Sequence, residues 1–390
     1  MKTIAFYLPQ YHEIPENNKM WGKGFTEWTN VKKAKPLFKD HYQPVEPLDD
    51  NYYDLTDPSV MDWQIKLARQ YGIYGFCFYH YWYNGRIIMR TPIENYLTDK
   101  RLDFPFCICW ANHDWSMAWV SKEDDVLYRQ DYNDRSDWRI HFDFLLPYLK
   151  DERYIRVEDK PLLIIYEASR IQLLPEMMTQ WNMWALEAGL PGLKFAYESV
   201  HADVTPGFDD SAFDYDIEYQ PQYARVMSYQ IKQTKVINLL KYVNDHLLHL
   251  NAAKIIKRFR KDRLTEFDYD DLWRRILSMG PISSKSIPGA FVNVDTTPRR
   301  QERGIVTKGM TPDKLEKYLM LQIERAREVY HSDMIFVYAW NEWAEGAYME
   351  PDKRWGYGVL KAFQNALIKT NEFPTIPYAY SSRDKDDHII

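Results

Sequence analysis

Short apolar runs alternate along the chain with segments in which apolar residues recur every three or four positions. The runs are rich in β-branched and aromatic residues, which is typical of buried strands. They occupy residues 3–7, 75–79, 106–109, 162–166, 194–197, 215–219, 290–294 and 335–339. The segments between them predict amphipathic helices. The clearest of these are at residues 57–71, 138–149, 175–187, 312–330 and 358–368.

This alternation of strands and helices predicts a (β/α)8 TIM barrel, an α/β fold. A doubly wound open sheet is the alternative. No G-x-G-x-x-G motif follows a predicted strand, so nothing in the chain supports a dinucleotide-binding fold.

The last predicted strand ends in polar residues that include two carboxylates. Trp340 and Asn341 come first, followed by Glu342, Trp343, Ala344 and Glu345. In parallel α/β folds, ligands meet catalytic groups at the carboxyl ends of strands. Glu342 and Glu345 would face opposite ways on a continuing strand, so sharing a site requires a turn near Trp343. Gly346 can help the chain to turn. The alternative is a solvated loop beside a core tryptophan.

Aromatic and polar residues also follow the other predicted strands, and a barrel would gather them at one face. Aromatic platforms suit the C–H faces of a sugar ring, and amides, imidazoles and carboxylates suit its hydroxyl groups. We therefore predict a carbohydrate site, whose candidate substrate-binding residues are Tyr11, His12, Tyr79, His80, Trp82, Trp110, Asn112, Trp115, Tyr166, Glu198, Asn293, Asp295, Trp340 and Asn341. Cleavage of a glycosidic bond needs two carboxyl groups, and Glu342 and Glu345 are the candidates.

Other chemistries have weaker support. His80, His113, Asp114 and His201 lack the H-x-H or H-E-x-x-H spacing of metal sites, so neither a metal nor another cofactor is expected. No G-x-S-x-G motif supports a serine nucleophile.

Composition narrows the class of protein further. Of the 390 residues, 16% are aromatic, including 14 Trp and 30 Tyr, which fits either sugar stacking or a heavily aromatic core. The formal charge of -6 argues against a nucleic-acid partner, which would require a basic surface. Cys77, Cys107 and Cys109 lie in predicted strands and are expected to be buried and reduced.

The predicted organisation is one catalytic domain at 1–375 and a polar tail at 376–390. A basic helical insertion is expected at 222–288, between strands six and seven. Basic residues are densest at 254–263. This part is either a solvated helical face or a contact for an acidic glycan or membrane surface. The chain enters a strand at once, and no apolar run is long enough to span a membrane. A soluble, cytoplasmic protein is therefore expected.

Five motifs together resemble the WbsX family. They are YLPQYH at 7–12, GFTEW at 24–28, FYHYW at 78–82, WANHDW at 110–115 and NEWAEG at 341–346. The resemblance extends from about residue 3 to 368, and the family is related to glycoside hydrolase family 99, the endo-α-mannosidases and endomannanases.

The resemblance to family 99 implies a (β/α)8 barrel and a retaining mechanism. In that mechanism one Glu removes the proton from the sugar's 2-hydroxyl, which attacks C1 and gives a 1,2-anhydro sugar. The second Glu protonates the leaving group and then activates water. By this resemblance, Glu342 takes the base role and Glu345 the acid/base role, with an α-mannoside- or α-rhamnoside-like polysaccharide as substrate.

Three alternatives stay open. WbsX proteins are often described as glycosyltransferases, so the chain is alternatively a glycosyltransferase or transglycosylase in O-antigen or capsule biosynthesis. Against this, no nucleotide-sugar site and no D-x-D in a Rossmann-like context is recognisable. A non-catalytic glycan-binding barrel is the second alternative, and a conventional retaining pair of Glu167 and Glu342 is the third.

Overall fold

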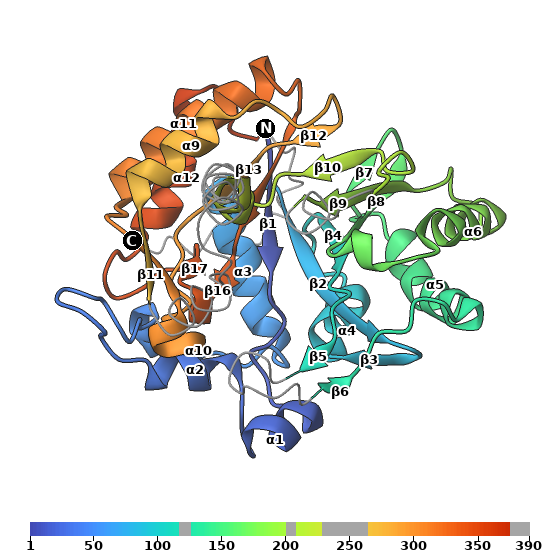
Figure 1. The fold of residues 1–390 in the computed structure, drawn as a ribbon, viewed down its shortest axis with the longest axis horizontal. Coiled ribbons are helices and arrows are strands. Elements are labelled where there is room, and N and C mark those ends of the chain that lie inside the picture. The colour runs from blue at the N-terminus through green and yellow to red at the C-terminus, as the bar shows by residue number, and fades with distance from the viewer. Residues whose placement is uncertain (117–125, 200–207, 228–263, 375–390) are drawn as a thin grey trace, which may run out of the picture.

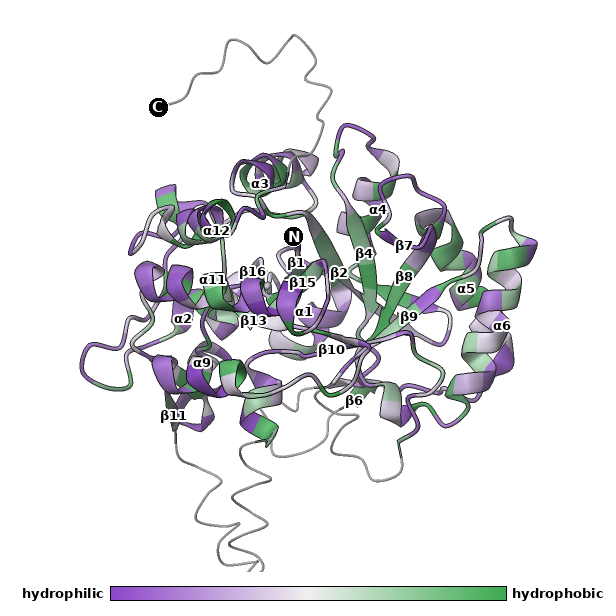
Figure 2. Ribbon diagram, turned by 90° about the horizontal axis from the view of Figure 1, so that it is seen from above, coloured by the Kyte–Doolittle hydropathy of each residue, from purple (hydrophilic) through white to green (hydrophobic). Residues whose placement is uncertain are grey.

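A computed structural model describes residues 1–116, 126–199, 208–227 and 264–374. Its main sheet is a nearly closed barrel of parallel strands (Figures 1 and 2). These are β1 (Lys2–Tyr7), β2 (Gly75–Tyr83), β4 (Phe106–Trp110), β8 (Lys160–Ile165), β9 (Lys194–Glu198), β10 (Tyr215–Ile217), β12 (Ser286–Ile287), β13 (Gly289–Phe291) and β15 (Met334–Tyr338). The predicted (β/α)8 class is confirmed.

The seventh strand position consists of two pieces that close the ring. β12 pairs with β10, and β13 pairs with β15, with only Pro288 between them. The predicted strand at 290–294 is therefore wrong in its bounds, because the strand begins four residues earlier. The buried Ser286 donates a hydrogen bond of 3.0 Å to Asp216. A polar residue therefore starts this strand, and the apolar run alone places the start of the strand too late.

Helices surround the barrel and turn their apolar faces toward it (Figure 2). They are α3 (Pro58–Gln70), α4 (Arg90–Thr98), α5 (Arg135–Leu149), α6 (Leu174–Glu187), α9 (Tyr269–Ser278), α11 (Pro312–Glu328) and α12 (Gly358–Lys369). α5 begins before the predicted residue 138 because the Asp134 side chain accepts a hydrogen bond from the Ser136 backbone N–H and caps the helix.

Smaller elements gather at the carboxyl ends of the barrel strands, below the barrel in Figure 1. They include helices α1 (Pro15–Trp21), α2 (Glu27–Lys33) and α10 (Thr297–Arg300). Two-stranded sheets join β5 (Trp115–Ser116) to β6 (Val126–Tyr128), β11 (Thr265–Asp268) to β14 (Ile305–Lys308) and β16 (Asn341–Glu342) to β17 (Ala347–Tyr348). The segment after β1 thus contains the two short helices α1 and α2. β3 (Arg86–Ile88) and β7 (Arg156–Val157) pair antiparallel with β2 and β8.

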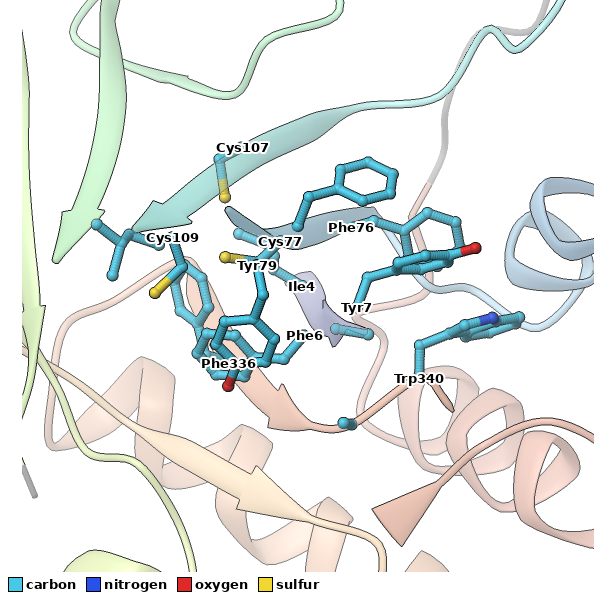
Figure 3. Packing of buried hydrophobic residues seen from close by; sticks show 14 of the residues in the cluster. Ile4, Phe6, Tyr7, Phe76, Cys77, Tyr79, Cys107, Cys109, Phe336 and Trp340 are labelled. Carbon is cyan, nitrogen blue, oxygen red and sulfur yellow. The ribbon is translucent and has the colours of Figure 1, made fainter. Parts of the chain in front are cut away.

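Side chains of the barrel strands alternate between two apolar environments (Figure 3). Phe6 stacks on Tyr79 and contacts Phe336, each with ring centroids 5.5 Å apart. On the other face, Tyr7 packs on Phe76 at 5.2 Å. Many of the aromatic residues are thus core. Cys77, Cys107 and Cys109 are buried free thiols, as predicted.

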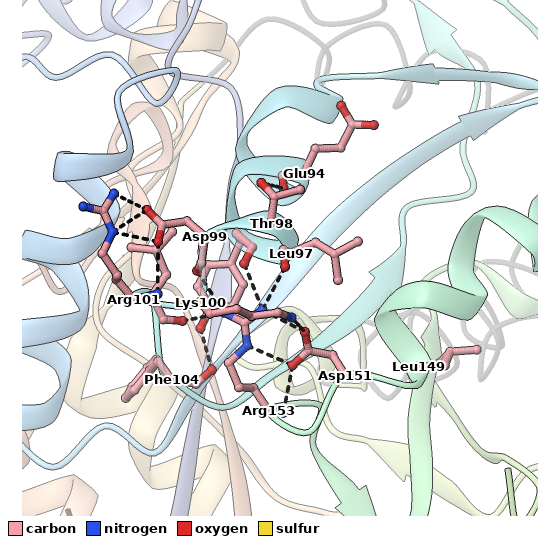
Figure 4. Close-up of polar contacts among 12 residues, drawn as sticks. Glu94, Leu97, Thr98, Asp99, Lys100, Arg101, Phe104, Leu149, Asp151 and Arg153 are labelled. Atoms are coloured by element: carbon pink, nitrogen blue, oxygen red, sulfur yellow. Dashed lines mark hydrogen bonds and ion pairs between the residues drawn. The ribbon is translucent and has the colours of Figure 1, made fainter. Parts of the chain in front are cut away.

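A polar network joins the end of α4 to the segment after α5 (Figure 4). The Arg153 guanidinium donates hydrogen bonds to the backbone oxygens of Tyr96 (2.9 Å) and Leu102 (2.8 Å) and to the Asp151 carboxylate (2.8 Å). Lys100 donates a second charged bond of 2.6 Å to Asp151. Arg153 therefore supplies donors to carbonyls that the helix end leaves unpaired.

Parts of the predicted organisation lie outside the described residues. The basic run 254–263 and the tail 376–390 belong to them, and of the insertion 222–288 only the two ends are described. These ends contain β11 and α9. Across the part of the chain that is described, no helix has the length and apolar character needed to cross a bilayer.

Replacing Arg153 by Met tests the network of Figure 4. The Arg153 side chain is 9% exposed, and its loss removes one of the two charged donors of Asp151 and takes this donor from several carbonyls. We expect the free energy of unfolding to fall by about 3 kcal/mol. Arg101→Met is the matched control, because Arg101 also pairs with an aspartate but is 87% exposed. Urea denaturation gives the free energy of unfolding of both variants. Equal values would contradict the interpretation.

Candidate functional site

The chain turns sharply just after β15. Asn341 and Glu342 form β16, Trp343–Glu345 is a single 3-10 turn, and Gly346 has a left-handed backbone with φ of 64°. The Asn341 side chain accepts a hydrogen bond of 2.7 Å from the Leu8 N–H and donates one of 3.0 Å to the Leu8 oxygen. Tyr11 also bonds to this turn, at the Asn341 carbonyl and at the Trp343 N–H. The segment after β1 thus holds the turn after β15.

Trp343 anchors the middle of the turn. Its ring stacks on Tyr348, with centroids 3.9 Å apart, and its Nε1 donates a hydrogen bond of 2.6 Å to Glu350. Glu350 also accepts from Tyr53 (2.8 Å) and Gln64 (2.7 Å). Burial raises the pKa of Glu350 to about 7, against the opposing effect of these donors. The predicted turn near Trp343 is confirmed.

The turn places Glu342 and Glu345 against one guanidinium. Arg299 of α10 donates 3.1 Å bonds to Glu342 and to Glu27, and it also forms an ion pair with Glu345. All four side chains are about nine-tenths buried or more. We name this cluster of Arg299, Glu27, Glu342 and Glu345 the arginine clamp.

Charge in the clamp is not balanced, because three carboxyl groups face one guanidinium. Burial raises the pKa of Glu342 to about 8, and the charges of Glu345 and Glu27 add to this rise while Arg299 opposes it. The Tyr338 hydroxyl donates to the other oxygen of Glu345. Burial, and then Glu345, raise the pKa of Tyr338 well above its ordinary value, so this hydroxyl remains a donor.

The clamp forms one side of a pocket of about 700 Å³ at the carboxyl ends of the strands. This volume is within the range of small-molecule and sugar sites. Aromatic rings form much of its lining: Trp21, Phe25, Tyr79, Tyr81, Trp115, Tyr166, Tyr219 and Tyr338. Polar groups lie among them, including Gln10, Asn30, His113, Asp114 and Glu167. The pocket therefore combines flat apolar surfaces with hydrogen-bonding groups.

The structure brings only some of the predicted substrate-binding residues to this pocket. Tyr79, Trp115 and Tyr166 line it together with Glu342 and Glu345. Tyr11 and Asn341 instead hold the turn from behind, as described above.

Three predicted residues face α5 rather than the pocket. His80 lies 2.9 Å from His141, joined through their Nε2 atoms, and Trp82 stacks on His141 with ring centroids 4.6 Å apart. Trp110 contacts the same ring at 4.8 Å. Burial lowers the pKa of His80 to about 3, which keeps this imidazole neutral. Trp340 faces outward too, against Phe76 at 5.0 Å.

Asp295 supports the clamp from outside the pocket. Its backbone N–H donates a 2.6 Å bond to the backbone carbonyl oxygen of Glu345. Its carboxylate accepts bonds from His41 (2.8 Å) and Gln43 (2.7 Å). Burial raises its pKa, but these donors outweigh burial and lower the pKa overall.

Four further predicted residues are not among those that line the pocket. Asn112 bonds both backbone groups of Glu167, at 2.7 and 3.0 Å, and so positions a residue that does line it. Glu198 is buried and accepts a 3.3 Å bond from the Cys109 thiol, and burial raises its pKa. Burial also lowers the pKa of His12, and Asn293 is half-buried.

Several residues of the site were not predicted. Glu27 lies within the GFTEW motif, which was used only for resemblance, and Arg299 lies in the segment TTPRR after the seventh strand. His201 lies outside the described residues. Among those described, no three His, Cys, Asp or Glu side chains are grouped so that they could hold a metal ion.

Comparison with protein families gives one match that covers nearly the whole chain. Residues 3–363 match the family described as Glycosyltransferase WbsX. The chain is 35% identical over 378 residues to the uncharacterized protein WxcX of Xanthomonas campestris pv. campestris strain B100, and 34% identical over 382 residues to WxcX of strain ATCC 33913. Each alignment covers 95% of this chain and 50% of the relative, so the chain spans about half the length of these relatives.

Solved structures with a similar fold include glycoside hydrolases. The GH99 endo-alpha-mannosidase of Bacteroides thetaiotaomicron in complex with BIS-TRIS-propane has a TM-score of 0.52 at 13% identity, covering 95% of this chain and 97% of that one. A protein described as glycoside hydrolase-like has a TM-score of 0.51 at 12% identity, covering 96% and 94%. At such identities the likeness shows the fold.

Replacing Gly346 by Ala tests whether the turn after β15 depends on close packing. A Cβ atom there would lie 2.8 Å from both the Cβ and the backbone N of Asp295. We expect Gly346→Ala to lower the free energy of unfolding by about 3 kcal/mol, of which about 1 kcal/mol is the cost of the positive φ.

Gly356→Ala is the matched control, because Gly356 also has a positive φ, of 53°, but an added Cβ would meet nothing within 4 Å. Its expected loss is only about 1 kcal/mol. Thermal and urea denaturation give both values. Equal losses in the two variants would show that Asp295 does not restrict the turn.

Proposed function

The chain belongs to the family described as Glycosyltransferase WbsX, and we propose that it is a carbohydrate-active enzyme that hydrolyses glycosidic bonds. Its substrate is an α-mannoside- or α-rhamnoside-like polysaccharide, cleaved with retention of configuration. The single observation that carries this proposal is the arginine clamp, which presents Glu342 and Glu345 together in an aromatic-lined pocket.

The first half of the reaction forms a 1,2-anhydro sugar. Glu342 accepts the proton of the 2-hydroxyl as O2 attacks C1, and the bond from C1 to the leaving oxygen breaks. Glu345 gives its proton to that oxygen. The attack requires O2 to lie anti to the leaving group, as it does in α-mannosides and α-rhamnosides. No carboxylate needs to reach C1, so the separation of a conventional retaining pair does not apply.

The second half reverses the proton transfers. Glu345 takes a proton from water, the water oxygen attacks C1, and the C1–O2 bond breaks. Glu342 then returns the proton to O2, so both carboxyl groups regain their starting states. Glu342 acts first as a base and then as an acid, and Glu345 acts in the opposite order. Such double roles favour pKa values near the working pH.

The electrostatics of the clamp support this chemistry. Because the pKa of Glu342 is raised to about 8, the clamp holds a proton near neutral pH, and the mechanism requires one proton on the pair. A carboxylate with a raised pKa is also a stronger base toward a hydroxyl group. The same shift favours a second assignment, in which Glu342 is the first proton donor and Glu345 the base.

The roles can be separated with two substrates that differ in their leaving group. Glu345→Gln should lower kcat for an α-mannan-type oligosaccharide by about 10²–10⁴-fold but still release fluoride from the corresponding glycosyl fluoride in a first-turnover burst, because fluoride leaves without protonation whereas the second half still lacks its base. Glu342→Gln should lose activity on both substrates. Glu187→Gln, which changes an exposed residue of α6, is the control.

Reducing ends report cleavage of the oligosaccharide, and a fluoride electrode reports the second substrate. Full activity of Glu345→Gln on both would remove it as the acid. If Glu342→Gln, and not Glu345→Gln, released fluoride from the glycosyl fluoride, the two roles would be exchanged.

The description of the family favours glycosyl transfer as a second candidate function. A transferase should bind a nucleotide sugar and pass its sugar to an acceptor glycan. Calorimetry with nucleotide sugars and product analysis with and without acceptor separate the two functions. Turnover that depends on a nucleotide sugar would replace hydrolysis as the conclusion.

A further inference from the structure

Arg225 and Arg300 are among the arginines that line the pocket apart from the clamp. Arg225 is in the helical residues 222–227 that follow β10, and Arg300 is the last residue of α10. Both line the pocket that contains Glu342 and Glu345. The Arg225 guanidinium carbon lies 5.0 Å from the ring centre of Phe267 in β11, and the group donates a hydrogen bond to Gln222. These contacts fix the position of Arg225 without neutralising its charge.

Arg225 makes no ion pair with any residue of the described chain, and its Nε is buried without a hydrogen-bond partner. Two other guanidinium groups of the same wall are paired, and that of Arg129 is exposed. Arg299 is paired with three carboxylates, and Arg170 with Glu167. A buried cation without an anion is unfavourable, so a charge of this kind needs a ligand or a function.

The neighbourhood of Arg225 increases this imbalance. Burial and the positive charge of Arg300 lower the pKa of Arg225 to about 10, although Glu345 and Tyr338 oppose the shift. Arg300 is therefore close enough to repel Arg225 across the wall. An anion beside Arg225 would accept a hydrogen bond from its open Nε and relieve the repulsion from Arg300 at once.

We propose that Arg225 and Arg300 form an anion subsite, and that the glycan bound in this pocket carries an acidic group there, either a carboxylate or a phosphate. A guanidinium presents donors in a planar fork that matches both groups. This inference rests on the proposed function in taking a glycan as the ligand, and it deepens that function by assigning an acidic substrate.

The subsite has a definite place relative to the clamp. Arg225 lies within the electrostatic reach of Glu345 and Tyr338, and all three line the pocket. With Glu345 as the proton donor, the acidic group lies on the side of the leaving group. The clamp itself would not attract that group, because its own carboxylates already surround Arg299. The anion therefore lies beside Arg225 and Arg300 and not at the clamp.

Binding of monosaccharides tests the subsite separately from catalysis, because these probes contain no glycosidic bond. The probes are mannose, mannuronate and mannose 6-phosphate, and titration calorimetry with the full chain gives Kd for each. We expect at least one acidic probe to bind about ten-fold or more tightly than mannose, a factor that corresponds to about 1.4 kcal/mol. Whichever acidic probe binds more tightly identifies the group as carboxylate or phosphate.

Arg225→Met should abolish the preference for the acidic probe and leave the Kd of mannose unchanged, whereas Arg225→Lys should retain part of it. Arg274→Met, which removes an exposed arginine of α9, is the matched control for net charge and should retain the full preference. Equal binding of all three probes by the unmodified protein, or an unchanged preference in Arg225→Met, would overturn the proposal. Neither outcome depends on whether Glu342 and Glu345 cleave a bond.

Discussion

Arg299 lies between three carboxylates that come from separate parts of the chain, and the whole site depends on this contact. Glu27 is contributed by α2, Glu342 by β16 and Glu345 by the 3-10 turn that follows. Without the guanidinium, like charges would be buried next to one another, so the carboxyl groups would have to take up protons. With it, two carboxyl groups are held at fixed positions on one side of a sugar-sized pocket.

The surrounding structure restricts the clamp from several directions. Asn341 joins the end of β15 to the end of β1, and the Asp295 N–H holds the Glu345 carbonyl. Trp343 is fixed between Tyr348 and Glu350. These supports are buried in the protein and do not line the pocket, yet they determine where the two carboxyl groups lie. The supports lie in segments that directly follow strands β1, β13 and β15, so the barrel sets their positions.

Strand periodicity explains which site residues could be predicted from the sequence. The predicted second strand ended at residue 79, but β2 continues to Tyr83, so side chains keep alternating through the FYHYW motif. Tyr79 and Tyr81 therefore reach the pocket, while His80 and Trp82 face α5. The same alternation sends Trp340 outward while Tyr338 faces Glu345. The expectation that residues past a strand share one face failed where the strand itself continued.

Long-range pairing explains what the sequence did not reveal. Arg299 is 272 residues from Glu27 and 43 from Glu342, so no local pattern links them. The Glu pair was recognisable because a turn and a strand end lie beside it, whereas an arginine in a basic segment resembles a solvated one. The proposed anion subsite is hidden in the same way, because Arg225 and Arg300 come from different barrel loops.

The most direct measurement of the clamp is the titration of Glu342 by carbon-13 NMR of labelled Glu carboxyl groups, assigned by the signal missing in Glu342→Gln. Glu342 should titrate near pH 8 in the unmodified protein, because burial and two neighbouring carboxyl groups oppose its ionisation. In Arg299→Met its pKa should rise further, because the positive charge that opposes this rise is removed. An ordinary carboxyl pKa in both proteins would show that Glu342 is not held in the clamp.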